Sequence, residues 1–152
     1  MIGWSDTELA IRDAIRDFAN AEIRPHLDAL DSGEMLPYPL IRKLFSTFGI
    51  DAMMADSFEK RIAKEKNGSA AGGDESGPGG DDAMQLILSI ELTKVAMGLT
   101  AAMGVSMGLA GGTIMSRGNV EQKERWARDL MTFNKVGAWA ITEPNSGSDA
   151  FG

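Results

Sequence analysis

Apolar residues recur at helical spacing in the first quarter of the chain. Ser5 and Glu8 have the spacing of a capping box, which marks the start of a helix. The residues that follow are apolar on one side and charged on the other, and Arg24-Pro25 is expected to bend or end this helix. We expect Ile11, Ala14, Ile15, Phe18, Ala19 and Ile23 to face inward, with Arg12, Asp13, Arg16 and Asp17 on the opposite side.

Turn residues separate this helix from a second one. Asp31-Ser32-Gly33 and Pro37 indicate a loop, and Gly49 suits the C-terminal end of the helix that follows. The residues of the second helix predicted to face inward are Leu40, Ile41, Leu44, Phe45 and Phe48. From Lys64 to Asp82 the sequence becomes polar and rich in glycine, so it can bury little and we expect a mobile loop. A phosphate-binding loop is not favoured, because no Gly-Lys-Ser/Thr follows.

A third helix is predicted from about Asp82 through Leu86, Ile87, Ile90, Glu91 and Val95. The segment from Val95 to Met115 then has no charge and is long enough to cross a bilayer, with glycines spaced as in packed membrane helices. Its many small residues give it only modest hydrophobicity. We therefore expect a pair of tightly packed, fully buried helices and no membrane span.

A change of pattern follows the last predicted helix. Asn119 and Gln122 form a second capping box, and Trp126, Leu130 and Met131 are expected to face inward. Val136–Thr142 has the pattern of a strand, which the turn residues Glu143–Asp149 terminate. The fold class is therefore all-α, with a helical domain at residues 1–135 and the start of a second, β-type domain at residues 136–152.

Composition narrows the classes of function. The 152 residues carry a net charge of −7, so a basic surface for nucleic acid is not indicated. Cysteine is absent and His26 is the single histidine, so a metal site would need carboxylates alone, and we expect His26 to lie on the surface or to be partly packed. The acidic pairs Asp28/Asp31 and Asp81/Asp82 are expected to be solvated helix caps. No basic and apolar leader opens the chain, and we expect a cytoplasmic protein.

The loop from Thr142 to Asp149 is the strongest candidate for chemistry. It concentrates hydroxyls, a proline and a glycine directly after a strand, a composition that can direct free amides at a phosphate or a polarised carbonyl. A plain turn at a strand end is an equally good interpretation of the spacing alone.

Ala140-Ile141-Thr142-Glu143-Pro144-Asn145-Ser146-Gly147-Ser148-Asp149 resembles the acyl-CoA dehydrogenase signature A-x-T-E-P-x-A-G-S-D, with serine for alanine at Ser146. Ile90-Glu91-Leu92 is similar to the S-E-E-L helix of that family, and Gly118 to Lys123 to its G-x-x-x-Q-K turn. Asp31 to Leu40 and Phe48-Gly49-Ile50 resemble its first loop and helix end. The resemblance covers nearly the whole chain.

The resemblance implies FAD as cofactor, with Trp139 to Ser148 lining it. Trp139 would lie against the isoalloxazine ring, and Ile141 and Thr142 would meet its pyrimidine edge. Ser148 would bind the FAD phosphates by its amide and the acyl-CoA substrate by its hydroxyl. The glycine-lined helices from Leu92 to Gly112 would form part of the acyl pocket.

The chain departs from the family in two ways. The loose Lys64–Asp82 stretch stands where family members have a short E-x-G-G-x-G segment, which leaves the acyl-chain length open. The β-domain and the helical bundle that supplies the catalytic base are not in these residues. We expect a chain cut off after the first flavin loop, with no catalytic residue of its own and no activity alone.

The parent would be an α,β-desaturating enzyme, a homotetramer or heteromer, that passes electrons to an electron-transferring flavoprotein or a similar acceptor. One alternative keeps the fold but makes the parent an acyl-CoA oxidase or a related flavin monooxygenase. The other alternative is a non-catalytic helical subunit of a heteromeric flavoenzyme.

Overall fold

The structure, a computed structural model, describes residues 4–68 and 82–149. The regular structure of these residues is helical, with no strand among them, in agreement with the all-α expectation. The elements in chain order are α1 (Asp6–Phe18), η1 (Ala19–Ile23), η2 (Arg24–His26), α2 (Leu27–Asp31), α3 (Tyr38–Phe48), α4 (Ile50–Lys66), α5 (Asp82–Met103), η3 (Gly104–Gly111), α6 (Gly112–Arg117), α7 (Val120–Gln122), η4 (Lys123–Ala127) and α8 (Arg128–Met131).

Helix α1 begins at the predicted capping box. The Glu8 amide donates to Ser5 Oγ at 3.3 Å, and the Ser5 amide donates to the Glu8 carboxylate at 2.6 Å. The helix continues through the π-helical turn η1 and changes to the 3-10 turn η2 at Arg24-Pro25, which confirms the expected bend. Ala14 is exposed, contrary to prediction, because the apolar stripe narrows there to Ile15.

Gly49 joins two helices, of which only the first was predicted. It has a left-handed backbone (φ 66°), which glycine adopts without steric cost, and it both ends α3 and precedes α4. Helix α4 was missed because its buried residues, mainly Phe58 and Ile62, are isolated among polar neighbours. It continues to Lys66, so the predicted loop does not begin at Lys64, and residues 69–81 of that loop lie outside the described residues.

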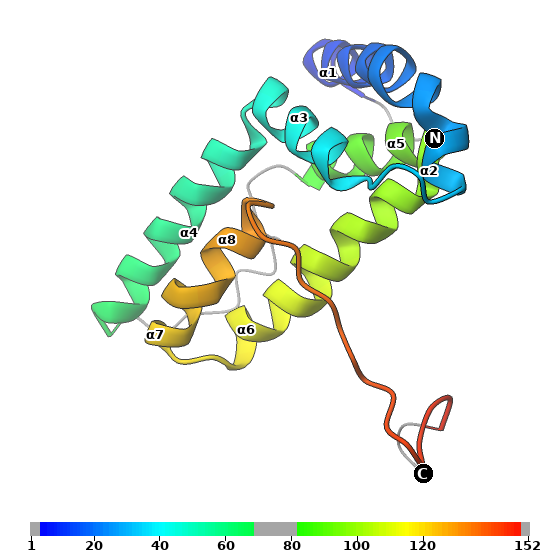
Figure 1. Ribbon diagram of the computed structural model, residues 1–152. Helices are drawn as coiled ribbons and strands as arrows, with labels where there is room; N and C mark the ends of the chain where they lie inside the picture. The colour runs from blue at the N-terminus through cyan, green and yellow to red at the C-terminus, as the bar shows by residue number, and fades with distance from the viewer. Residues whose placement is uncertain (1–3, 69–81, 150–152) are drawn as a thin grey trace.

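Elements α5, η3 and α6 follow one another as a long helical rod that is sharply kinked within α5 (Figure 1). The kink is at Ala96, whose backbone is not helical (φ −149°, ψ 90°), next to the boundary predicted at Val95. The expected full burial is wrong: Met97 is 69% exposed and Leu109 46% exposed. Neighbouring elements cover only part of the rod, since α1 and α3 pack on α5 while α8 packs on η3 (Figure 1).

The helical stretch Ala83–Arg117 is long and apolar enough to cross a membrane, judged by length and composition. Only 28% of its most apolar window is buried. A single helix of this kind is weak evidence for a membrane span, because core helices of soluble proteins can meet the same criterion.

The last helical elements begin at the second predicted capping box. The Gln122 amide donates to Asn119 Oδ1 at 2.9 Å, and the Asn119 amide donates to Gln122 Oε1 at 2.9 Å. Leu130 and Met131 are buried as predicted, but Trp126 is 42% exposed. The turn η4 is π-helical, which shifts the face that an ordinary helix would present, and Ala127 takes the inward position instead.

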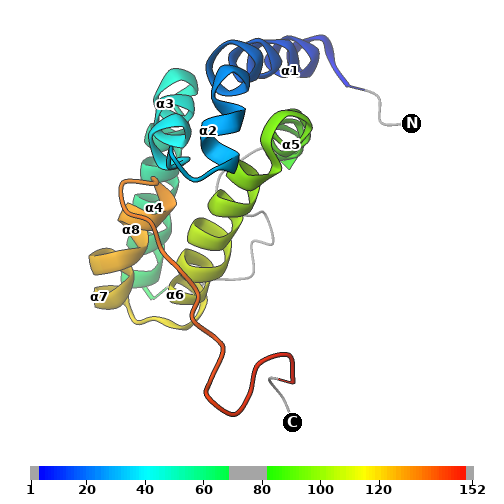
Figure 2. The same ribbon diagram turned by 45° about the vertical axis from the view of Figure 1, so that its right-hand side comes forward.

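The buried apolar residues form two clusters. The larger lies where α1, α3 and α5 meet, and the smaller lies between α4, α6 and the α7–α8 region (Figures 1 and 2). The fully buried members of the larger cluster include Ile15, Ile41, Leu44, Phe45, Ile87, Leu92 and Phe133. The smaller cluster consists of Phe58, Ile62, Met115, Ala127 and Met131.

Candidate functional site

A turn at Phe133 directs the chain out of α8. Phe133 has a positive φ of 58°, a conformation that costs a residue with a side chain roughly 1–2 kcal/mol. Its ring is fully buried, with centroids 6.2 Å from Tyr38 and 5.9 Å from Phe45. The Arg42 guanidinium donates to the Phe133 carbonyl at 3.1 Å and to the Asn134 carbonyl at 3.3 Å. Aromatic burial and these hydrogen bonds offset the backbone cost and fix the direction of exit.

The segment that leaves α8 is attached to η3 at one point. The Gly137 amide donates to Ser106 Oγ at 2.9 Å, and Ser106 is fully buried. A Cβ atom at Gly137 would lie 2.7 Å from Ala110 Cβ and 3.1 Å from Leu130 Cδ2. Glycine is therefore required for this close approach, which sets where the predicted flavin segment starts.

From Gly137 to Thr142 the chain runs away from the helices, and these residues pair with no strand among the described residues (Figure 1). The predicted strand Val136–Thr142 is not formed, because a strand is defined by hydrogen bonds to a partner. Trp139 is 44% exposed and Ile141 58% exposed. These two apolar side chains thus lie open on the surface.

The residues after Thr142 form a closed turn. Glu143 and Ser146 exchange two backbone hydrogen bonds, at 2.8 and 3.1 Å, and Ser146 Oγ donates to the Asp149 carbonyl at 2.5 Å. The structure thus brings residues 143–149 together, while every predicted flavin-lining residue from Trp139 to Ser148 is exposed except the half-buried Ser146. No hydrogen bond to the Thr142 or Ser148 hydroxyl occurs within the described part of the chain.

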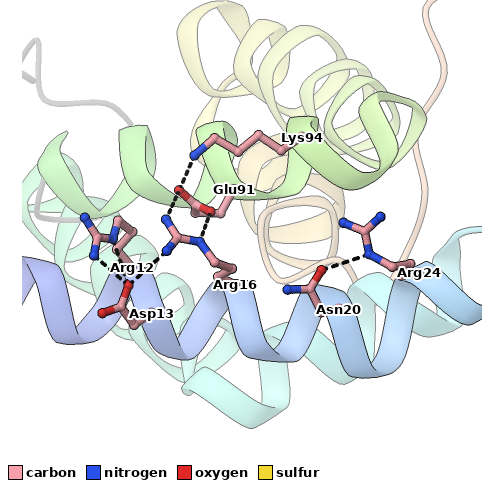
Figure 3. Close-up of polar contacts among 7 residues, drawn as sticks. All are labelled: Arg12, Asp13, Arg16, Asn20, Arg24, Glu91 and Lys94. Atoms are coloured by element: carbon pink, nitrogen blue, oxygen red, sulfur yellow. Dashed lines mark hydrogen bonds and ion pairs between the residues drawn. The ribbon is translucent and has the colours of Figure 1, made fainter.

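Glu91 is a buried carboxylate that the sequence pattern did not single out for a role. Arg16 donates to its two oxygens at 2.9 and 3.1 Å, and Lys94 Nζ lies 2.7 Å away (Figure 3). Hydrogen bonding to Arg16, the largest effect, lowers the pKa of Glu91 to about 2, Lys94 acts in the same direction and burial opposes both. Arg16, expected on the solvated side, therefore joins α1 to α5.

Lys123, the last residue of the turn that resembles G-x-x-x-Q-K, has a structural partner. Its Nζ lies 2.8 Å from both carboxylate oxygens of Glu65, and its side chain is 8% exposed. This contact ties η4 to α4, beside the exposed pair Lys66–Glu124 at 2.7 Å. The partner could not be identified from the sequence, because α4 was not predicted.

A cavity of about 180 Å³ lies between α4, η3, α6 and α8. Gly108 and Gly112, at the end of the segment predicted for the acyl pocket, form part of its wall. Its remaining lining residues are Met54, Ser57, Phe58, Arg61, Met107, Met115, Ser116 and Met131. The wall is therefore mostly apolar and rich in methionine.

The other candidates from the sequence are on the surface. His26, Asp28 and Asp31 are exposed in and around the short elements η2 and α2. Asp81 and the side chain of Asp82 lie outside the described residues. Among the residues that the structure describes, no three His, Asp or Glu side chains gather where they could hold a metal ion.

Known proteins share sequence similarity with this chain. A sequence model of the family "Acyl-CoA dehydrogenase, N-terminal domain" matches residues 67–134. An acyl-CoA dehydrogenase of Bacillus subtilis is 28% identical over 94% of this chain and 33% of its own length. The short-chain specific acyl-CoA dehydrogenase of Clostridium acetobutylicum is 29% identical over 92% of this chain and 32% of its own length. The caffeyl-CoA reductase-Etf complex subunit CarC of Acetobacterium woodii is 30% identical over 98% of this chain and 35% of its own length.

The fold has a counterpart of known structure. Butyryl-CoA dehydrogenase from Megasphaera elsdenii superposes with a TM-score of 0.61 at 23% identity, over 99% of this chain and 36% of the other. The chain spans about a third of the length of the curated relatives it matches. Residues 67–134 thus match the N-terminal domain of the acyl-CoA dehydrogenase family, and nearly the whole chain is similar to acyl-CoA dehydrogenases over about a third of their length.

Proposed function

We propose that this chain supplies the flavin-facing edge of an FAD-dependent acyl-CoA dehydrogenase, an oxidoreductase that introduces an α,β double bond into an acyl-CoA thioester. The names of its relatives support this reaction class. Because those relatives are about three times as long, the reaction belongs to a larger assembly that includes this domain.

One observation carries the proposal. The turn from Thr142 to Asp149 is closed by its own backbone hydrogen bonds and stands on a segment fixed at Gly137. Its Thr142 and Ser148 hydroxyls are exposed and have no partner within residues 4–68 and 82–149. Short hydroxyls and amides on a rigid turn suit the polar edge and the phosphates of a flavin dinucleotide.

Four residues of the segment would then have a role. Trp139 would pack against the isoalloxazine ring, and the Ile141 backbone and the Thr142 hydroxyl would meet its pyrimidine edge. Ser148 binds the FAD phosphates through its amide and the CoA arm through its hydroxyl. Bound FAD supplies the acceptor for the β-hydride of the thioester. We assign no base to this chain, so the group that removes the α-proton belongs to another part of the assembly.

Substrate, partner and location are parts of the same proposal. The open backbone around Gly98 and Gly104, where an added Cβ would contact nothing within 4 Å, leaves room for an acyl chain beside Leu92–Gly112. The name of the Acetobacterium relative, an Etf complex subunit, supports an electron-transferring flavoprotein as the acceptor. We further propose that the full-length parent is a homotetramer or heteromer and is located in the cytoplasm. These two parts of the proposal rest on the sequence alone.

The test uses Thr142→Val in the longer flavoenzyme that the proposal requires. Removing the hydroxyl should leave the fold intact but slow reduction of the flavin by acyl-CoA roughly 100-fold, the order of one lost oxyanion-type donor. Rapid mixing that follows bleaching of the flavin absorbance measures this rate. Thr113→Val, at an exposed position in α6, is the matched control. An unchanged rate of reduction in Thr142→Val would remove Thr142 from its proposed role.

A further inference from the structure

The methionine-rich cavity is separate from the turn that carries the proposed flavin residues. One wall comes from α4, the helix that was not predicted from the sequence. The other walls come from η3, α6 and α8. Its volume of about 180 Å³ is slightly larger than the roughly 150 Å³ of an engineered apolar cavity that binds benzene. The space therefore suits about six carbon atoms.

The wall can adapt its shape to an apolar ligand. Met54, Met107, Met115 and Met131 contribute unbranched side chains, which fill irregular spaces and repack readily. A Cβ atom at Gly108 would contact nothing within 4 Å, so the backbone leaves that part of the wall open. The cavity accepts a flexible chain better than a rigid, closely fitted ring.

Arg61 gives the cavity one cationic group. It lines the cavity with Ser57, one helical turn earlier on α4, and it has no ion pair within the described part of the chain. The carboxylate one turn later, Glu65, is engaged by Lys123 at 2.8 Å. A single guanidinium beside an apolar space matches a carboxylate, whose two oxygens it can bind together.

We propose that this cavity binds a small monocarboxylate, with a tail of about six carbons among the methionines and its carboxylate paired with Arg61. A singly charged ligand is favoured over a phosphate ester, because Arg61 is the one cationic side chain among the described residues that line the cavity. Gly108 and Gly112 of its wall belong to the segment proposed to lie beside the acyl chain, but the occupant of this cavity requires neither FAD nor another domain.

Two ligands with the same tail test the charge. Hexanoate and hexanamide are titrated into the 152-residue chain labelled with ¹³C at the methionine methyl groups, and the shifts of these methyl signals are followed by NMR. Hexanoate should bind at least 10-fold more tightly than hexanamide. Arg61→Gln should remove this difference, and Arg61→Lys should restore part of it. Arg117→Gln changes an exposed residue of α6 that does not line the cavity, and it should change the affinity for neither ligand.

A second pair of variants tests the space. Gly108→Leu should fill the cavity and weaken both ligands at least 10-fold, while Ala10→Leu, at an exposed position of α1 outside the cavity lining, should weaken neither. Equal affinity of the two ligands, no effect of Arg61→Gln, or unchanged binding in Gly108→Leu would each overturn the proposal. So would the absence of any methyl shift in the unsubstituted chain.

Discussion

At the scale of single residues, the glycines that permit close packing are not the ones that the spacing emphasised. Gly104 and Gly108 of the Gly-x-x-x-Gly series face open space. Gly111 lies against α8 instead, where a Cβ would come 2.7 Å from Met131 Cε. Gly137 brings the exit segment onto the same surface, next to Ser106. Small residues therefore serve one local contact, in which α8 and the exit segment lie against η3, and not a packed pair of long helices.

Gly137→Ala is expected to detach the exit segment from η3. The added methyl would lie 2.7 Å from Ala110 Cβ, which cannot move aside, so the hydrogen bond to Ser106 should be lost. Losing one partly buried hydrogen bond should lower the free energy of unfolding by about 1 kcal/mol. Urea unfolding and the exchange rate of the residue 137 amide measure both effects. Gly147→Ala, whose new methyl would lie at an ordinary 3.8 Å from Thr142 Cγ2, should behave like the unsubstituted chain.

At the scale of elements, two partly buried ion pairs join helical elements that are distant in the sequence. Arg16 and Glu91 join α1 to α5, while Lys123 and Glu65 join η4 to α4. One member of each pair is nearly inaccessible: Glu91 at 3% and Lys123 at 8% exposure. A buried charge without its partner is costly, so each pair strongly favours the observed arrangement of its two elements.

The Glu91 contact predicts a specific loss of stability in acid. Because folding lowers the pKa of Glu91 from 4.5 to about 2, its contribution is complete above pH 4.5 and is lost as the pH falls toward 2. A shift of this size corresponds to at most ~3 kcal/mol, and screening of the exposed cations reduces it to on the order of 1–2 kcal/mol.

Urea unfolding between pH 6 and pH 2, in roughly equal steps, measures this loss. Glu91→Gln should start less stable at pH 6 and should lose less stability on acidification than the unsubstituted chain. Glu59→Gln, which removes an exposed pair with Arg128 at 3.2 Å, is the control and should keep the original acid slope. Parallel acid slopes for Glu91→Gln and the unsubstituted chain would rule out the Glu91 contribution.

At the scale of the whole molecule, apolar side chains remain uncovered in two parts of the structure. The α5–η3 rod exposes Met97 and Leu109, and the exit segment exposes Trp139 and Ile141. Exposed apolar side chains are typical of a contact with other protein or with a ligand where they form a contiguous patch. This distribution accords with a domain that spans about a third of its relatives' length.

The 152-residue chain alone is expected to bind FAD weakly and to show no dehydrogenase activity. The segment from Trp139 to Ser148 pairs only within itself, at Glu143 and Ser146, and no other described residue pairs with it, so nothing holds it against a ring. Gel filtration with added FAD, followed by a visible spectrum and by acyl-CoA with a dye acceptor, measures binding and turnover. A yellow chromophore that remains bound and bleaches with acyl-CoA would contradict this expectation and place a catalytic base within the chain.

Much of the candidate site could be predicted from local patterns. The two capping boxes, the bend at Pro25 and the left-handed Gly49 depend on neighbours within a few residues, and each occurs as predicted. The turn after Thr142 is likewise closed by residues three apart. Its assignment to a flavin rests on the resemblance of residues 140–149 to the family signature and stays a prediction.

Contacts between distant segments were decided only in the tertiary structure. The sequence by itself determined an all-α domain, most of its helix boundaries and the resemblance to acyl-CoA dehydrogenases, whose N-terminal domain matches residues 67–134. It did not predict α4, the outward position of Trp126 or the partners of Glu91 and Lys123. The physical reason is that periodicity reports which residues prefer burial, whereas actual burial depends on which neighbour covers each face. Along the α5–η3 rod that coverage is partial, so an uncharged segment with the composition of a core lies largely in the open.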